Sequence, residues 1–113
     1  MASEITLKEL KQKIDKAEKF YLIDARGREQ YEHNHIAEAL GVPWGPDFGE
    51  KAASVLPDKD AEIIVYGANE SCEQAKNVAE FLQSHGYANV RIFSAGILGW
   101  MEAGLRLEFG RES

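Results

Sequence analysis

The sequence has very little cysteine: Cys72 is the only one among its 113 residues. A single thiol cannot form a disulfide within the chain. Without a second cysteine, neither a zinc–thiolate cage nor a dithiol redox pair is expected. We therefore expect a reducing compartment, the cytoplasm, and any cysteine chemistry must depend on this one thiol.

Long hydrophobic runs and an excess of positive charge are also missing. No apolar stretch approaches the roughly 20 residues that a membrane-spanning helix needs, and the first residues lack the basic and apolar regions of a signal peptide. The net charge is −6 at pH 7, from 13 Lys and Arg against 19 Asp and Glu. Because phosphates would be repelled, neither nucleic acid nor an anionic membrane is an expected partner.

The length and composition that are present fit one small globular domain. A chain of 113 residues, 44% of them hydrophobic, can bury one core but not two. We see no repeat, low-complexity tract or linker, so we expect a single domain over residues 1–113.

The hydrophobic pattern predicts strands that alternate with helices. Thr6 and Glu9 form a capping-box pattern that begins a helix reaching about Lys16. Further helices are expected at residues 27–32 and 47–56, over a segment whose buried stripe runs from residue 75 to residue 82, and at residues 98–101, and Gly86 is a suitable terminator for the third of these. Strands are expected at residues 20–24, 40–43, 62–66, 90–93 and 105–108. Such alternation predicts an α/β fold with a mostly parallel central sheet and helices on both faces.

Four separated segments carry a family resemblance. The first is LIDAR at residues 22–26, similar to a strand that ends in Asp-x-Arg. The second is YEHNHIAEA at residues 31–39, similar to Tyr/Phe-x-x-Gly-His-Ile-x-x-Ala with Asn34 in place of glycine. The third is the strand at residues 63–66, which runs into a tight loop and a helix. The fourth is AGILGW at residues 95–100, similar to Gly-Gly-x-x-x-Trp with Ala95 for the first glycine. In this order and spacing they resemble a rhodanese domain over nearly the whole chain.

The resemblance implies a three-layer fold and a catalytic loop directly after the central strand. In that family a cysteine at the loop start is held as thiolate by backbone N–H groups and a helix N-terminus, and carries sulfur as a persulfide. The corresponding loop of this chain consists of Gly67, Ala68, Asn69, Glu70, Ser71 and Cys72. Glycine therefore stands at the expected nucleophile position, where a persulfide cannot form.

Two functions remain open from these residues. The first is a non-catalytic binding or regulatory module whose partner is a small sulfur-containing anion or a protein. The second is a sulfurtransferase or persulfide carrier that uses Cys72, as in family members with two loop cysteines of which the first is lost here. The spacing Ser71-x-x-Gln74 predicts a capping box, which would place Cys72 at the first helical position, where the positive helix end favours a thiolate. Glu70 and Glu73 oppose that thiolate and would repel thiosulfate.

Other polar residues have simpler interpretations. Asp24 and Arg26 are expected to form a structural pair, with substrate contact as the alternative. His35 matches the family histidine and is expected to hydrogen-bond a neighbouring loop. His33 and His35 lack further ligands nearby, so we expect no metal, and no motif indicates a cofactor. The resemblance also brings in phosphatases that share this fold and need a loop-start cysteine, a longer loop and an arginine. We set that function aside because Gly67 begins a short loop without arginine.

Overall fold

The computed structural model describes residues 3–110. Its helices are α1 (Leu7–Asp15), α2 (Arg28–His33), α3 (Phe48–Val55), α4 (Glu73–Ser84) and α5 (Gly96–Glu102). Its strands are β1 (Ser3–Glu4), β2 (Tyr21–Asp24), β3 (His35–Ile36), β4 (Leu40–Gly41), β5 (Glu62–Tyr66), β6 (Asn89–Phe93) and β7 (Leu107–Glu108). The predicted elements are all present, whereas the two-residue strands β1 and β3 were not predicted.

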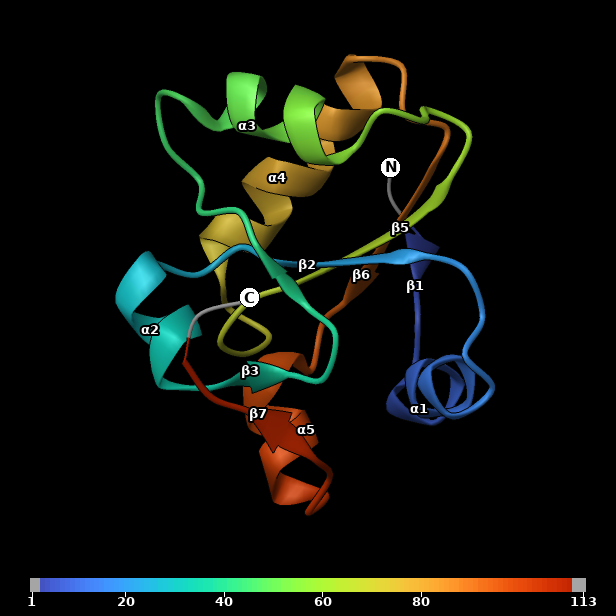
Figure 1. Cartoon of the computed structure of the whole chain (residues 1–113), viewed down its shortest axis with the longest axis vertical. Coiled ribbons are helices and arrows are strands. Elements are labelled where there is room, and N and C mark those ends of the chain that lie inside the picture. Colours follow the sequence, from blue (N-terminus) through green and yellow to red (C-terminus); the bar gives the residue numbers. More distant parts are fainter. Residues whose placement is uncertain (1–2, 111–113) are drawn as a thin grey trace.

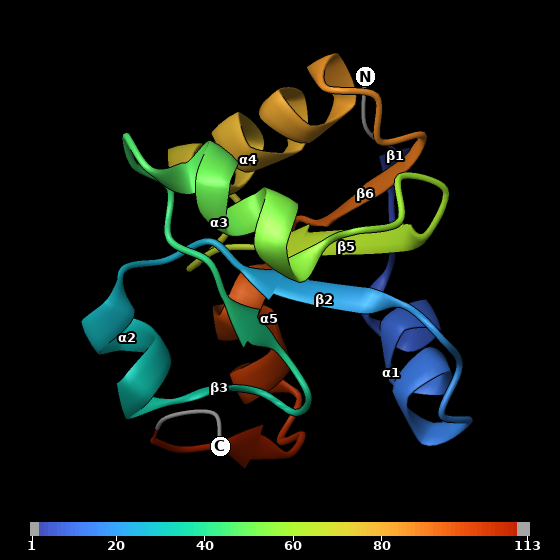
Figure 2. The same cartoon turned by 45° about the horizontal axis from the view of Figure 1, so that its top comes forward.

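Five strands form a central sheet in the order β1-β6-β5-β2-β4, and every pair within it is parallel. Helices cover both of its faces, with α3 and α4 on one side and α1 and α5 on the other (Figures 1 and 2). A small second sheet pairs β3 with β7 in antiparallel fashion. The predicted α/β, three-layer architecture is confirmed.

Alternating side chains of the central strands build two hydrophobic clusters, one on each face of the sheet. Ile23, Ile63 and Val65 point toward α3 and α4. Leu22 and Ile64 point the other way, where they meet α1 and α5. This period of two follows from the pleat of each strand and explains why β5 is apolar along its length, because both of its faces are covered.

Local signals in the sequence account for the helix ends. At α1 the Thr6 hydroxyl accepts a hydrogen bond from the Glu9 N–H, and the Glu9 carboxylate accepts one from the Thr6 N–H, so the predicted capping box is confirmed. After α4 the chain turns at Gly86, whose φ of +91° suits glycine.

The carboxyl ends of the parallel strands meet at one edge of the sheet, and this edge positions the candidate site. Asp24 at the end of β2 is in register with Tyr66 at the end of β5, and Tyr66 is in register with Phe93 at the end of β6. In open α/β sheets this edge is where ligands bind. Between residues 3 and 110, no helix is both long enough and apolar enough to span a bilayer.

Candidate functional site

The loop of residues 67–72 connects β5 to α4 at the carboxyl edge of the sheet. Gly67 is buried directly after β5, Ala68 to Ser71 are exposed, and Cys72 is half-buried. The loop thus begins in the core and ends at the N-terminus of a 12-residue helix, α4. A helix of this length carries partial positive charge at that end.

Asn69 organises the outer part of the loop. Its side-chain oxygen accepts a hydrogen bond from the Ser71 N–H at 2.9 Å, and its backbone carbonyl accepts one from the Cys72 N–H at 3.1 Å. This is an Asx turn, a conformation that asparagine side chains favour. Because these two N–H groups are bonded inside the loop, they are not free to hold an anion.

The capping box predicted at Ser71 is wrong. The N-cap of α4 is Cys72 rather than Ser71, and its side chain makes no capping hydrogen bond. The Cys72 thiol instead donates to the Oε1 of Gln74 at 3.3 Å. The Asx turn explains the difference, because it already satisfies the Ser71 N–H and shifts the start of the helix by one residue.

The N-terminus of α5 is bound to the inner part of the loop. The Ile97 N–H donates to the Gly67 carbonyl at 2.9 Å, and the Leu98 N–H donates to the Ala68 carbonyl at 3.0 Å. Gly96 makes this approach possible, since its φ is +66° and a Cβ there would lie 2.6 Å from the Gly67 oxygen. The glycine of the fourth sequence segment is therefore required by backbone packing against the loop.

Gly67 and Cys72, at opposite ends of the loop, share one space. A Cβ built on Gly67 would lie 2.5 Å from the Cβ of Cys72 and even closer to its Sγ, and 3.3 Å from the Cβ of Ala75. The Cys72 side chain therefore occupies the volume that a side chain at residue 67 would fill. Sequence spacing alone did not indicate this, because it depends on how the loop closes.

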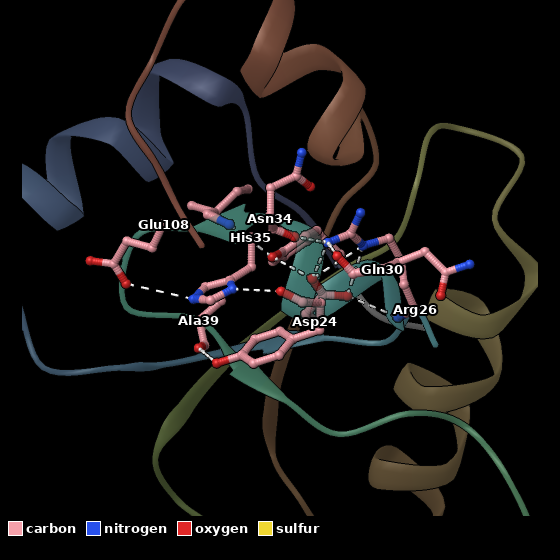
Figure 3. A network of polar contacts seen from close by, with 10 residues as sticks. Asp24, Arg26, Gln30, Asn34, His35, Ala39 and Glu108 are labelled. Carbon is pink, nitrogen blue, oxygen red and sulfur yellow. Dashed lines mark hydrogen bonds and ion pairs between the residues drawn. The ribbon is translucent and has the colours of Figure 1, made fainter. Parts of the chain in front are cut away.

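At the same edge of the sheet, Asp24 and Arg26 form a buried ion pair (Figure 3). The Arg26 guanidinium donates to both carboxylate oxygens of Asp24 at 2.7–3.2 Å and also to the backbone carbonyls of Gln30 and Asn34. Burial opposes the charge on Arg26, yet its bonds to Asp24 leave the pKa of Arg26 raised, and electrostatic interaction with Cys72 contributes in the same direction. The predicted pairing of the two side chains is confirmed.

Tyr66 ties this ion pair to the central strand. Its hydroxyl donates to the Asp24 carboxylate at 2.7 Å and accepts from the Ile36 N–H at 3.0 Å. Burial, followed by the charge of Asp24, raises the pKa of Tyr66, so the hydroxyl stays protonated. Sequence reasoning missed this role because the tyrosine is 42 residues from Asp24.

His35 is buried against α2, close to the ion pair. Its Nδ1 lies 2.8 Å from the Tyr31 carbonyl, and its ring stacks on the Tyr31 ring with centroids 4.0 Å apart. A carbonyl can only accept, so Nδ1 carries a proton and Nε2 faces the Glu108 carboxylate at 3.6 Å (Figure 3). The prediction that His35 bonds to a neighbouring loop is therefore wrong, because its partner Tyr31 lies in the helix α2, while its contact with Glu108 joins β3 to β7.

The charged side chains in and next to the loop are acidic. Glu70 and Glu73 are exposed on either side of Cys72, and the loop itself contains no positively charged residue. Within residues 3–110, no group of three or more His, Cys, Asp or Glu side chains could hold a metal ion.

Comparison with known proteins places these features in a family. The rhodanese-like domain model matches residues 6–103. UBA4 of Candida albicans, an adenylyltransferase and sulfurtransferase, is 37% identical over 97 residues, and this match covers 79% of the chain but 21% of UBA4. The chain therefore corresponds to about a fifth of that relative.

Two further relatives match over most of their own length. YtwF of Bacillus subtilis is 32% identical over 97 residues, which cover 86% of this chain and 88% of YtwF. The solution structure of the rhodanese-like domain from the Anabaena protein Alr3790 superposes with a TM-score of 0.83 at 30% identity, covering 96% of this chain and 80% of that one. On its sequence and its fold, the chain belongs to the rhodanese-like domain family.

Proposed function

We propose that this domain carries sulfane sulfur as a persulfide on Cys72. The proposal rests on one observation: the Cys72 side chain fills the space that a side chain would occupy if residue 67 were not glycine. The resemblance puts the family nucleophile at residue 67, and here a thiol from the other end of the loop reaches the same place. The sulfurtransferase relative supports this class of chemistry.

The surroundings of Cys72 suit a reactive thiol in two respects. The residue is half-buried and lines a cavity, so small molecules can reach it. It also lies at the N-terminal end of α4, where negative charge is stabilised. A reducing, cytoplasmic location would keep the thiol free of disulfides.

The sulfur transfer has two steps. The Cys72 thiolate attacks the outer sulfur of a donor such as thiosulfate, and a new S–S bond forms on Cys72. The S–S bond of thiosulfate breaks, and sulfite leaves with the bonding electron pair. An acceptor nucleophile such as cyanide then attacks the outer sulfur, giving thiocyanate and returning the Cys72 thiolate.

Intact mass after donor treatment tests the proposal directly, because Cys72 is the only cysteine. We expect thiosulfate or inorganic polysulfide to add one sulfur atom to the wild type and none to Cys72→Ser. Cyanide should remove that sulfur and release thiocyanate. If the wild type gains no sulfur with either donor, or gains it equally in Cys72→Ser, the proposal is wrong.

A second variant moves the thiol to the other end of the loop. The single change Gly67→Cys has no room beside Cys72, so we combine it with Cys72→Gly, which frees that space. If the two positions present a thiol to the same place, the double variant should also accept a sulfur atom. A folded double variant that gains none would argue that the two thiols are not equivalent.

A binding module without turnover is the second candidate. Leu98 and Met101 on α5 are 47% and 45% exposed, and Leu98 lines a hollow beside Asn69 and Glu70. Exposed apolar side chains next to a loop fit a protein partner better than an anion, since two loop N–H groups are already bonded to Asn69. Failure of the persulfide test in a folded protein would leave this candidate.

A further inference from the structure

A cavity of about 500 Å³ extends from Cys72 along one side of α4. Gly67 and Cys72 line one end, and Ala75, Ala79 and Ile92 provide apolar surface between α4 and β6. The volume is within the range of roughly 300–1,000 Å³ that is usual for small-molecule sites. The cavity therefore offers room for an organic molecule in reach of the thiol.

Charged groups reach this cavity from three elements. Glu4 comes from β1, Glu70 from the loop, and Lys76 and Glu80 from α4, so carboxylates outnumber the ammonium group three to one. The Glu4 carboxylate is held at the end of β6 by the Ser94 hydroxyl, which donates to it at 3.1 Å. Lys76 and Glu80 follow Cys72 at intervals of four residues, which places them along the same side of the helix.

These charges decide which sulfur compounds fit. The carboxylates repel a dianion such as thiosulfate, which should therefore load Cys72 slowly, whereas they attract an ammonium group. The apolar side chains of Ala75, Ala79 and Ile92 line the same cavity as the thiol and the carboxylates, which suits a short alkyl chain. A molecule with sulfur at one end and an ammonium group at the other therefore matches the chemistry of this lining.

We propose that the cavity selects aliphatic aminothiols and their persulfides as the compounds with which Cys72 exchanges sulfur. This inference rests on the proposed persulfide function and adds the class of its small-molecule partner. The aminothiol thiolate attacks the outer sulfur of the Cys72 persulfide and forms a new S–S bond. The S–S bond to Cys72 breaks, and Cys72 leaves as thiolate; the reverse reaction loads the protein.

Thiol–disulfide exchange tests the charge selection without needing any persulfide. The Cys72 thiolate attacks one sulfur of a symmetric disulfide, a mixed disulfide forms, and one thiolate leaves. Three probes of similar size differ in charge: cystamine is cationic, bis(2-hydroxyethyl) disulfide is neutral, and 3,3′-dithiodipropionate is anionic. Intact mass follows each reaction, and free 2-mercaptoethanol serves as reference for the intrinsic reactivity of each probe.

We expect Cys72 to prefer cystamine over the anionic probe by about tenfold more than the reference thiol does, because three carboxylates line the cavity that Cys72 also lines. The double variant Glu4→Gln/Glu80→Gln should lower this preference severalfold, and Lys76→Gln should increase it. Glu29→Gln is the matched control, because it removes one carboxylate on α2 that does not line the cavity. High salt should reduce the preference of the wild type.

The results separate this inference from the proposed function. If Glu4→Gln/Glu80→Gln leaves the preference unchanged while Cys72 still carries a persulfide, the selection by the cavity is wrong and the proposed function stands. If the preference depends on the carboxylates but no donor loads Cys72, the selection holds and the proposed function fails. The rates of sulfur transfer from the Cys72 persulfide to cysteamine and to 3-mercaptopropionate test the same selection on the persulfide itself. We expect the ratio of these two rates to be higher for the protein than for a small-molecule persulfide, and an equal ratio would contradict the inference.

Discussion

Replacing Gly67 with alanine tests whether Cys72 really occupies the space at residue 67. The added Cβ would lie 2.5 Å from the Cβ of Cys72 and 3.3 Å from that of Ala75. Non-bonded carbon atoms prefer separations of about 3.5–4.0 Å. The contact with the Cβ of Cys72 is therefore short by about 1.0–1.5 Å, whereas the contact with Ala75 is only slightly tight.

This geometry sets the expected magnitude. Overpacking of a well-packed site costs about 1–3 kcal/mol, so we expect Gly67→Ala to lower the free energy of unfolding by about 2 kcal/mol. The backbone does not add to this cost, because Gly67 has no positive φ. If Cys72 is first replaced by glycine, the same alanine should be neutral or stabilise by about 0.4–1 kcal/mol, since alanine restricts the unfolded chain.

A double-mutant cycle measures the coupling between the two positions. Urea unfolding followed by tryptophan fluorescence gives the stability of the wild type, Gly67→Ala, Cys72→Gly and the double variant, with buried Trp100 as a probe. Glycine is an acceptable N-cap residue, so Cys72→Gly should itself cost little at the helix end. The reasoning is refuted if Gly67→Ala destabilises the protein equally with cysteine and with glycine at residue 72.

Three further predictions concern the surroundings of the loop. Gly96→Ala should cost about 2–3 kcal/mol in urea unfolding, from positive φ and overlap with a loop carbonyl, whereas Gly104→Ala, with positive φ but open space, should cost about 1 kcal/mol. Arg26→Gln leaves a buried carboxylate unpaired and should cost about 3–5 kcal/mol, against less than about 0.5 kcal/mol for the exposed Arg28→Gln; equal losses would contradict a structural role for the buried pair. The pKa of Tyr66 is raised above 10.0, so the contribution of its protonated hydroxyl to stability is complete below that pH and is lost as the pH rises further. The urea midpoint of the wild type should therefore fall more steeply above pH 10.0 than that of Tyr66→Phe, which has no hydroxyl to titrate.

The sheet and its helices could be predicted because their patterns are long. The segment of residues 62–66 is continuously apolar, as a strand covered on both faces must be, and its expected bounds agree with those of β5. In contrast, β1 and β3 contain two residues each, too few to show any periodicity. Each is defined by pairing with a strand that is distant in the sequence, β6 for β1 and β7 for β3.

The loop was predictable in position but not in conformation. The strand before it and the helix after it fixed where it lies, and the Asp24–Arg26 pair could be read from adjacent residues. The predicted start of α4 was wrong because the Asn69 side chain accepts the hydrogen bond of the Ser71 N–H, which in a capping box at Ser71 would donate to the Gln74 side chain. Asparagine two residues before serine is the local signal for that turn. The overlap of residues 67 and 72 has no local signal at all.

The acidic cavity could not be predicted from the sequence either. The spacing of Cys72, Lys76 and Glu80 indicates one side of a helix, but nothing in the sequence shows that this side faces an open space rather than the core. Glu4, which approaches from β1, is separated from these residues by most of the chain and meets them only through the pairing of β1 with β6.

Residues 67 and 72 share one side-chain volume, which has a consequence for how this loop can change over time. With Cys72 oriented as it is here, a side chain at residue 67 fits only if residue 72 becomes small or its side chain turns away from the loop start. The effect of a mutation at one position therefore depends on the residue at the other, which restricts the order in which substitutions can accumulate. In laboratory evolution from this sequence, a thiol should move to residue 67 most readily through an intermediate that has lost the side chain of Cys72.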